Sequence, residues 1–269
     1  MTTSIEIFDV GHGACSVITS PASKRLMIDC GDNPDRPWFP SSKYSGISIE
    51  ELVISNFDED HVSDLPNLLT KAQISFMVVN NSVSPDALEH LKMETGMGTG
   101  IQRLITWMRH ISGQSSSGNP NFDEISISFF YNEYPRDFED ENNLSVVTFV
   151  EYSGFRIIYP GDLESAGWQS LLRNSLFSSK LQHINVFVAS HHGRKSGCCE
   201  DVFYICKPQI VVMSDRDRQF NSQETTQWYS QRCEGINYQN GKRYVFTTRS
   251  DGDIKIVVDK SSWSISTSR

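Results

Sequence analysis

Positive charge is scarce in this 269-residue sequence: 24 Lys and Arg residues stand against 33 Asp and Glu, which gives a net charge of -9. A protein that binds nucleic acid through a broadly basic surface is therefore excluded, and any phosphate contact must come from a local basic patch. Apolar runs of membrane-spanning length and a signal-peptide pattern are also missing. We therefore expect a cytoplasmic protein with no membrane partner.

The C-x-x-C motif of many metal-binding and redox proteins is absent as well. The six cysteines form no C-x-x-C motif, which argues against a disulfide framework and favours reduced, mostly buried thiols. No internal repeat or low-complexity linker divides the chain. Since 38% of the residues are hydrophobic, with 15 Phe and 5 Trp, there is ample material for a core. We predict a single domain over residues 1–269.

The apolar pattern predicts a mixed α/β (α+β) protein. Three short segments joined by tight turns, at 4–8, 15–18 and 24–29, are typical of a β-meander at the start of a sheet. Later apolar segments predict strands at 75–79, 125–131, 146–152, 155–159, 186–189, 210–213, 244–248 and 254–259, with helices around 85–110, 168–176 and 201–205. The glycine cluster at 96–100 has no strand before it and lacks the full dinucleotide fingerprint, so it indicates a helix break.

The stretch from Ile54 to His61 has the most unusual composition. It places three carboxylates and a histidine in four consecutive positions, Asp58 to His61, between the apolar run 52–54 and a helix expected near Leu65. Carboxylates this close repel one another unless a cation or hydrogen-bond donors compensate. From these residues alone, an exposed acidic turn and a cation-binding loop are both open.

Two further strand ends carry residue types that bind metals. Asp162 follows the strand 155–159, and His191 and His192 follow the strand 186–189. Each motif alone has an ordinary structural explanation, as a Gly-Asp turn or a hydrogen-bonded loop. Together with the acidic stretch, all at the carboxyl ends of apolar strands, they predict a site for a divalent metal. Carboxylates and imidazoles suit manganese, zinc or iron. Asp29 and Asp32, at another strand end, fit either a functional role or turn chemistry.

These motifs resemble the metallo-β-lactamase superfamily, and within it the metallo-hydrolase domain of the ComEC-type bacterial DNA-uptake proteins. The resemblance extends from Phe8 to about Asp259. It is carried by the segments 9–13 (DVGHG), 28–31 (IDCG), 60–61 (DH), 142–145 (NNLS), 161–162 (GD) and 190–193 (SHHG). It implies a four-layer αβ/βα sandwich with a metal site at one edge between the two sheets.

The sequence departs from the family pattern at the acidic stretch. The usual H-x-H-x-D-H motif begins here with Asn56, and Asp58 takes the second histidine slot. A third family histidine falls near Asn143. The resemblance then implies the metal ligands Asp58, Asp60, His61, Asp162, His191 and His192, holding one or two ions. Oxygen ligands in place of imidazoles favour Mn²⁺ or Mg²⁺ relative to Zn²⁺.

The resemblance implies a metal-dependent hydrolase with Asp60, His61 and His192 in catalytic roles. Arg194 and Lys195 are candidates for phosphate binding, and a solvated surface turn is the alternative. His12 and Asn143 are further candidates for substrate contacts. A phosphodiesterase or nuclease acting on phosphodiester substrates, including nucleic acid, is the first hypothesis. The alternatives are a hydrolase of a small ester, thioester or lactone, and a catalytically impaired sensor or protein partner.

Overall fold

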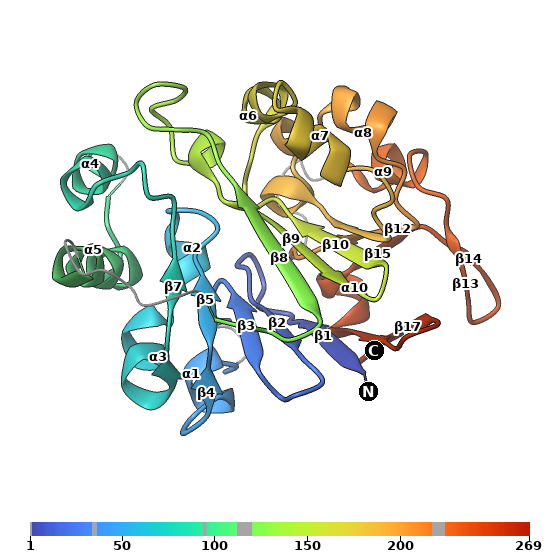
Figure 1. Cartoon of the computed structure of the whole chain (residues 1–269), viewed down its shortest axis with the longest axis horizontal. Helices are drawn as coiled ribbons and strands as arrows, with labels where there is room; N and C mark the ends of the chain where they lie inside the picture. Colours follow the sequence, from blue (N-terminus) through green and yellow to red (C-terminus); the bar gives the residue numbers. More distant parts are fainter. Residues whose placement is uncertain (1, 34–36, 94–95, 112–119, 217–223) are drawn as a thin grey trace.

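The structure, a computed structural model, describes residues 2–33, 37–93, 96–111, 120–216 and 224–269. Its centre is a pair of mixed β-sheets (Figure 1). The first sheet has seven strands in the order β17 (Trp263–Thr267), β16 (Ile254–Val258), β1 (Thr3–Ile7), β2 (Ser16–Thr19), β3 (Arg25–Ile28), β5 (Glu51–Val53) and β7 (Met77–Val78). The predicted N-terminal meander is confirmed, because β1, β2 and β3 are consecutive antiparallel neighbours.

The second sheet has six strands. Their order is β15 (Val245–Thr247), β12 (Ile210–Met213), β11 (Val186–Val188), β10 (Phe155–Tyr159), β9 (Val147–Tyr152) and β8 (Ile125–Phe130). From β10 to β15 the neighbouring strands are parallel. Because parallel strands end at the same edge of a sheet, the loops after β10, β11 and β12 lie together.

Successive side chains along each strand point to opposite faces of its sheet, and those on the inner faces fill the space between the two sheets. In β2, Val17 packs on the outer side of the first sheet, whereas its neighbour Ile18 packs between the sheets. This is the two-residue period of a strand with both faces covered. The middle layer contains side chains from both sheets, for example Ile5 and Ile7 of β1 with Ile157 of β10.

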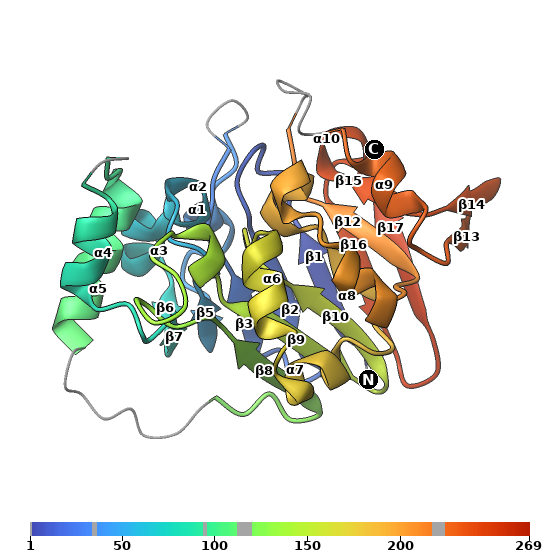
Figure 2. The same ribbon diagram turned by 90° about the horizontal axis from the view of Figure 1, so that it is seen from above.

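Helices cover the outer face of each sheet (Figures 1 and 2). The first sheet carries α1 (Pro40–Lys43), α3 (Leu65–Lys71), α4 (Pro85–Leu91) and α5 (Thr99–Ile111). The second carries α6 (Ser165–Leu171), α7 (Ser175–Lys180), α8 (Glu200–Ile205) and α9 (Thr226–Ser230). The order helix, sheet, sheet, helix confirms the predicted four-layer sandwich.

The remaining elements are short. They are α2 (Glu59–Val62), α10 (Thr248–Asp251), the pairs β4 (Ser48–Ile49) with β6 (Gln73–Ile74) and β13 (Ile236–Tyr238) with β14 (Gly241–Arg243), and the 3-10 turns Asn142–Leu144, Ser190–Gly193 and Lys195–Gly197. None of the described helices combines the length and the apolar character needed to cross a bilayer.

Three local predictions were wrong. The acidic stretch is not all loop, because Glu59 to Val62 form α2. The helix expected over 168–176 is two helices, α6 and α7, since the Asn174 side chain accepts hydrogen bonds from the backbone N–H groups of Leu176 and Phe177 and starts a new helix there. Strand β17 was not expected, because this edge strand is only half-buried and its apolar signal is weak.

Candidate metal centre

The three consecutive carboxylates of the acidic stretch turn to three different partners. Asp58 lies 2.5 Å from the ammonium of Lys92. Glu59 accepts backbone hydrogen bonds from Gly100 (2.7 Å) and Ile101 (3.0 Å) at the start of α5. Asp60 alone turns toward the carboxyl edge of the second sheet, where its Oδ2 lies 3.3 Å from His192 Nε2. The mutual repulsion expected from the sequence is thus relieved by donors on α4, α5 and the opposite sheet.

A buried carboxylate holds His61 in one orientation. Asp29 Oδ2 lies 2.9 Å from His61 Nδ1, and the Asp29 carboxylate also accepts from the backbone N–H (2.7 Å) and hydroxyl (2.6 Å) of Ser55. Asp29 adopts a left-handed backbone conformation, φ 60°, directly after β3. With Nδ1 hydrogen-bonded to Asp29, the other ring nitrogen, Nε2, is turned toward the second sheet, 3.2 Å from Asp162 Oδ1.

His192 approaches from the loop after β11. His191 and His192 both have positive φ angles, 50° and 52°, so the chain turns sharply and sends consecutive side chains to different places. His192 Nδ1 donates to the carbonyl of Ser214, after β12, at 2.9 Å. Its Nε2 then lies 3.5 Å from Asp162 Oδ1, in addition to the contact with Asp60.

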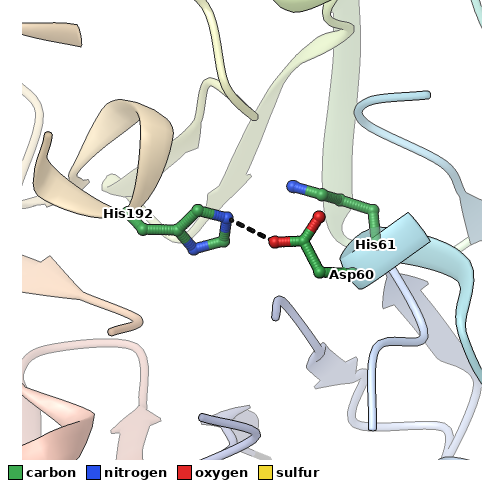
Figure 3. Close-up of side chains that lie close together, drawn as sticks. All are labelled: Asp60, His61 and His192. Carbon is green, nitrogen blue, oxygen red and sulfur yellow. Dashed lines mark ion pairs between the residues drawn. The ribbon is translucent and has the colours of Figure 1, made fainter. Parts of the chain in front are cut away.

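Asp60, His61 and His192 form a cluster whose potential ligand atoms all lie within 4.8 Å of one another (Figure 3). The Nε2 atoms of both histidines are buried and have no hydrogen-bond partner of acceptable geometry among the described residues. Asp162 adds a fourth donor, next to both imidazoles. Two unpartnered imidazole nitrogens facing two carboxylates are a donor set suited to a divalent transition metal. The residues therefore fit such an ion.

The side chains of the cluster and Asp162 shift one another's pKa values. Burial disfavours the charged forms of His61 and His192, but the neighbouring carboxylates, Asp162 foremost, outweigh burial and raise both pKa values. Burial alone would raise the pKa of Asp60, yet its close contact with His192 and the charge of His61 lower the pKa to about 2. The pKa of Asp162 is likewise lowered despite its burial, by the charges of His192 and His61. Both carboxylates are therefore ionised at neutral pH.

His191 lies on the far side of Asp162. Its Nδ1 is 3.0 Å from the hydroxyl of Ser196 and 3.2 Å from Glu164 Oε1, while its Nε2 is 3.7 Å from Asp162 Oδ2. Burial lowers the pKa of His191. The structure brings His192 but not His191 into the cluster, although the sequence prediction included both as ligands.

Asp58, Asn56 and Asn143 also lie outside the cluster, although the sequence analysis includes Asp58 among the metal ligands. Asp58 is paired with Lys92, as described above. The Asn56 amide donates to Asn142 Oδ1 and to the hydroxyl of Ser145. The buried Asn143 accepts from the backbone N–H of Gly167 (2.8 Å) and donates to Asp140 (3.0 Å), so both ends of its amide are engaged within the fold.

A cavity of about 470 Å³ opens beside Asp60. His12, in the turn after β1, lies on the wall of this cavity. The wall also contains Arg216, Arg249 and Arg269, among acidic residues that include Asp9 and Asp32.

Arg194 contacts His12 at this wall. Its guanidinium is 2.8 Å from His12 Nε2 and 3.5 Å from His191 Nε2. Burial, followed by the charge of His192, lowers the pKa of His12 to about 4. Lys195, the next residue after Arg194, is exposed to solvent.

Asp29 and Lys92 are partners of the stretch from Ile54 to His61 that the sequence alone does not identify. At Asp29 the sequence fits a functional role and turn chemistry equally. The segment 28–31 carries a signal for Asp29, because it is one of the family-like motifs. Lys92 carries no local signal, since a lone lysine after a helix is ordinary. Only the fold shows that Lys92 is 3% exposed and faces Asp58.

Comparison with solved structures defines the class of fold. The CmlA β-hydroxylase E377D mutant superposes with a TM-score of 0.54 at 8% sequence identity, covering 95% of this chain and 53% of that one. A protein of Parabacteroides distasonis ATCC 8503, named as a metal-dependent hydrolase, has 11% identity and a TM-score of 0.47, with coverage of 90% and 91%. The latter score is too low to support any inference. The chain has the metallo-β-lactamase fold, as its motifs and its four layers predict.

The sequence is similar to one segment of a particular protein, ComE operon protein 3 of Bacillus subtilis (strain 168). The two are 21% identical over a match of 229 residues. The match covers 78% of this chain but 28% of that protein. The chain thus spans little more than a quarter of this relative's length. No family model matches the chain. The similarity agrees with the resemblance to ComEC-type proteins.

Metal affinity is expected to rise steeply with pH. In the metal-free protein His61 and His192 hold protons above the ordinary histidine pKa of 6.5, and a cation must displace them because it needs neutral imidazole. From pH 6.5 upward to the raised pKa values, Mn²⁺ binding should tighten by about tenfold per pH unit for each proton displaced. Isothermal titration calorimetry in buffers of different ionisation enthalpy would count the protons released. Binding without proton release would contradict ligation by these histidines.

Stability of the metal-free protein should change with pH in the opposite direction. A raised histidine pKa stabilises the fold fully below the unfolded value, and this stabilisation is lost as the pH rises through the folded value. In EDTA the protein should therefore unfold more easily at alkaline pH, while Mn²⁺ should protect it most there.

Proposed function

We propose that this protein is a metal-dependent phosphodiesterase that hydrolyses phosphodiester bonds, including those of nucleic acids. The observation that supports this most directly is the cluster of Asp60, His61 and His192, which borders a cavity lined by His12 and three arginines. The resemblance to DNA-uptake proteins points to the same substrate class. Because the overall charge is negative, the phosphate must be recognised locally, by individual cationic side chains beside this cavity.

The residues of the cluster have separate roles in this proposal. Asp60, His61, Asp162 and His192 would hold the ion, which supplies Lewis acidity and lowers the pKa of a water molecule. Asp29 keeps Nε2 of His61 directed into the site. Asp60 is 30% exposed and reaches the cavity, so its ionised carboxylate can also accept a proton from the attacking water. Carboxylate oxygens are hard donors, so we expect Mn²⁺ to support faster turnover than Zn²⁺.

His12 and Arg194 form the phosphate-binding side. His12 is neutral at physiological pH because its pKa is lowered, so it can donate or accept a hydrogen bond without carrying charge. Arg194 provides a fixed positive charge next to it. A guanidinium held against an imidazole at the edge of the cavity is suited to neutralising one phosphate oxygen of the substrate.

Arg194→Ala is expected to raise KM for phosphodiesters more than it lowers kcat. The guanidinium binds the phosphate in the ground state and in the transition state alike, so its loss removes uniform binding. One charged hydrogen bond corresponds to an increase of about tenfold to a hundredfold in KM. Steady-state kinetics with a chromogenic phosphodiester would measure this. Lys195→Ala, which removes the same charge from the exposed next position, should leave KM near the wild-type value. Equal effects of both substitutions would refute specific binding by Arg194.

A catalytically impaired partner or sensor protein is the second candidate. It is favoured by the pairing of Asp58 with Lys92 and by the asparagine in the first histidine slot, Asn56, which leave Asp60 and His61 as the members of the acidic stretch in the cluster. In this case the protein would bind metal but would not catalyse hydrolysis.

Metal analysis of the purified protein, followed by an activity screen, tests the proposal. Chromogenic phosphodiesters, single-stranded DNA and a carboxylic ester would be assayed with Mn²⁺, Zn²⁺ and Mg²⁺ from pH 7 upward. The proposal predicts phosphodiester cleavage that is fastest with Mn²⁺ at alkaline pH, because the anionic ligands make the bound ion a weaker Lewis acid. Cleavage of the carboxylic ester alone would indicate a small-ester hydrolase. Bound metal without any turnover would favour the impaired partner.

A further inference from the structure

Asp58 is bound by a buried lysine that follows α4. Lys92 is 3% exposed, and its Nζ lies 2.5 Å from Asp58 Oδ1 and 3.1 Å from Glu141 Oε1. One ammonium thus sits between two carboxylates, one from the acidic stretch and one from the segment before the Asn142–Leu144 turn. A buried charge in this setting is stable only when it is paired.

We propose that the Lys92 ammonium takes the place of a cation between Asp58 and Glu141, and thereby limits this protein to one metal ion, at the cluster of Asp60, His61 and His192. This inference rests on the metal centre of the proposed function. Oxygen donors for a second cation are otherwise present. Besides the two carboxylates, the loop holds Asn56 Oδ1, a buried acceptor without a hydrogen-bond partner in the described part of the chain. An ammonium already occupies the gap between the carboxylates, so a divalent ion there would have to displace it.

The helical hairpin of α4 and α5 keeps Lys92 in position. The backbone N–H of Lys92 caps the end of α4, and the start of α5 holds Glu59, the neighbour of Asp58. A Cβ on Gly98 would lie 2.1 Å from the Glu59 carboxyl carbon, and one on Gly100 would lie 2.3 Å from the carbonyl oxygen of Val62. These glycines let the hairpin approach α2 closely. The hairpin therefore neutralises two of the three carboxylates and leaves only Asp60 for the ion.

Metal counting in Lys92→Met tests the inference. Methionine retains an unbranched chain as far as Cε and removes the ammonium, so the two carboxylates are left for a cation. Inductively coupled plasma mass spectrometry after dialysis against Mn²⁺ should find about one ion per chain in the wild type and about two in Lys92→Met. Lys71→Met, which removes an exposed lysine at the end of α3, should keep about one. Adding Asp58→Asn to Lys92→Met should return the count to about one.

The other outcomes separate this inference from the proposed function. One ion in both the wild type and a folded Lys92→Met would overturn the role of Lys92 and leave the metal centre intact. No ion in the wild type would overturn both. Two tightly bound ions in the wild type would overturn the inference even if Lys92→Met failed to fold. Thermal unfolding provides an independent readout: in EDTA Lys92→Met should melt below Lys71→Met, and Mn²⁺ should close that difference. Equal melting temperatures in EDTA would count against the inference.

Discussion

Asp60→Asn is expected to hydrolyse phosphodiesters about a thousandfold more slowly than the wild type, because a metal ligand contributes several kcal/mol of transition-state stabilisation. The substitution removes the one carboxylate that belongs both to the cluster and to the cavity wall. It also removes the charge that faces His192 Nε2 at 3.3 Å. Since the side chain is 30% exposed, the fold should tolerate an amide of the same shape.

The measurement is kcat/KM with Mn²⁺, accompanied by metal analysis of the same preparation. Asp32→Asn is a matched control, because it removes a carboxylate from the wall of the same cavity but outside the cluster. That control should retain its metal and most of its activity. Wild-type rates in Asp60→Asn would show that the reaction belongs to another site or to a contaminating enzyme.

Asp162→Ala is expected to lower both metal content and stability. Three imidazoles depend on this buried carboxylate: His61 at 3.2 Å, His192 at 3.5 Å and His191 at 3.7 Å. Breaking a buried ion pair by removing one partner costs about 3–5 kcal/mol. The variant should also lose the stabilisation that bound metal gives the folded state.

Urea unfolding in Mn²⁺ and in EDTA would separate the two effects. In EDTA the difference from wild type reports the lost carboxylate contacts, and in Mn²⁺ it includes the lost ligand. Asp162→Asn is the matched variant, since an amide retains the shape of the side chain and removes its charge. It should lose metal with a smaller loss of stability than the alanine variant. Full metal content and an unchanged unfolding midpoint in Asp162→Ala would remove Asp162 from the ligand set.

Much of the fold follows from local sequence patterns. Apolar alternation predicted the N-terminal meander, and apolar runs placed β10 and β12 at their observed bounds, because a strand with both faces covered buries side chains on either side. The same reasoning put Asp60, Asp162 and His192 at the carboxyl ends of strands. Parallel strands β10 and β11 bring Asp162 and His192 to one edge of the second sheet, where His192 also meets Asp60, which follows β5 of the first sheet.

Only the tertiary structure decided which side chains face each other. Sequence spacing placed His191 and His192 at the same strand end, but the left-handed backbone at both residues sends one ring to the cluster and the other to Glu164. The sequence likewise showed three adjacent carboxylates without their partners. Asp58 pairs with Lys92 across 34 positions, on a helical hairpin whose packing against α2 no local pattern encodes. Side-chain direction in a loop depends on backbone angles and on packing between distant segments, and neither is written in the residues of the loop itself.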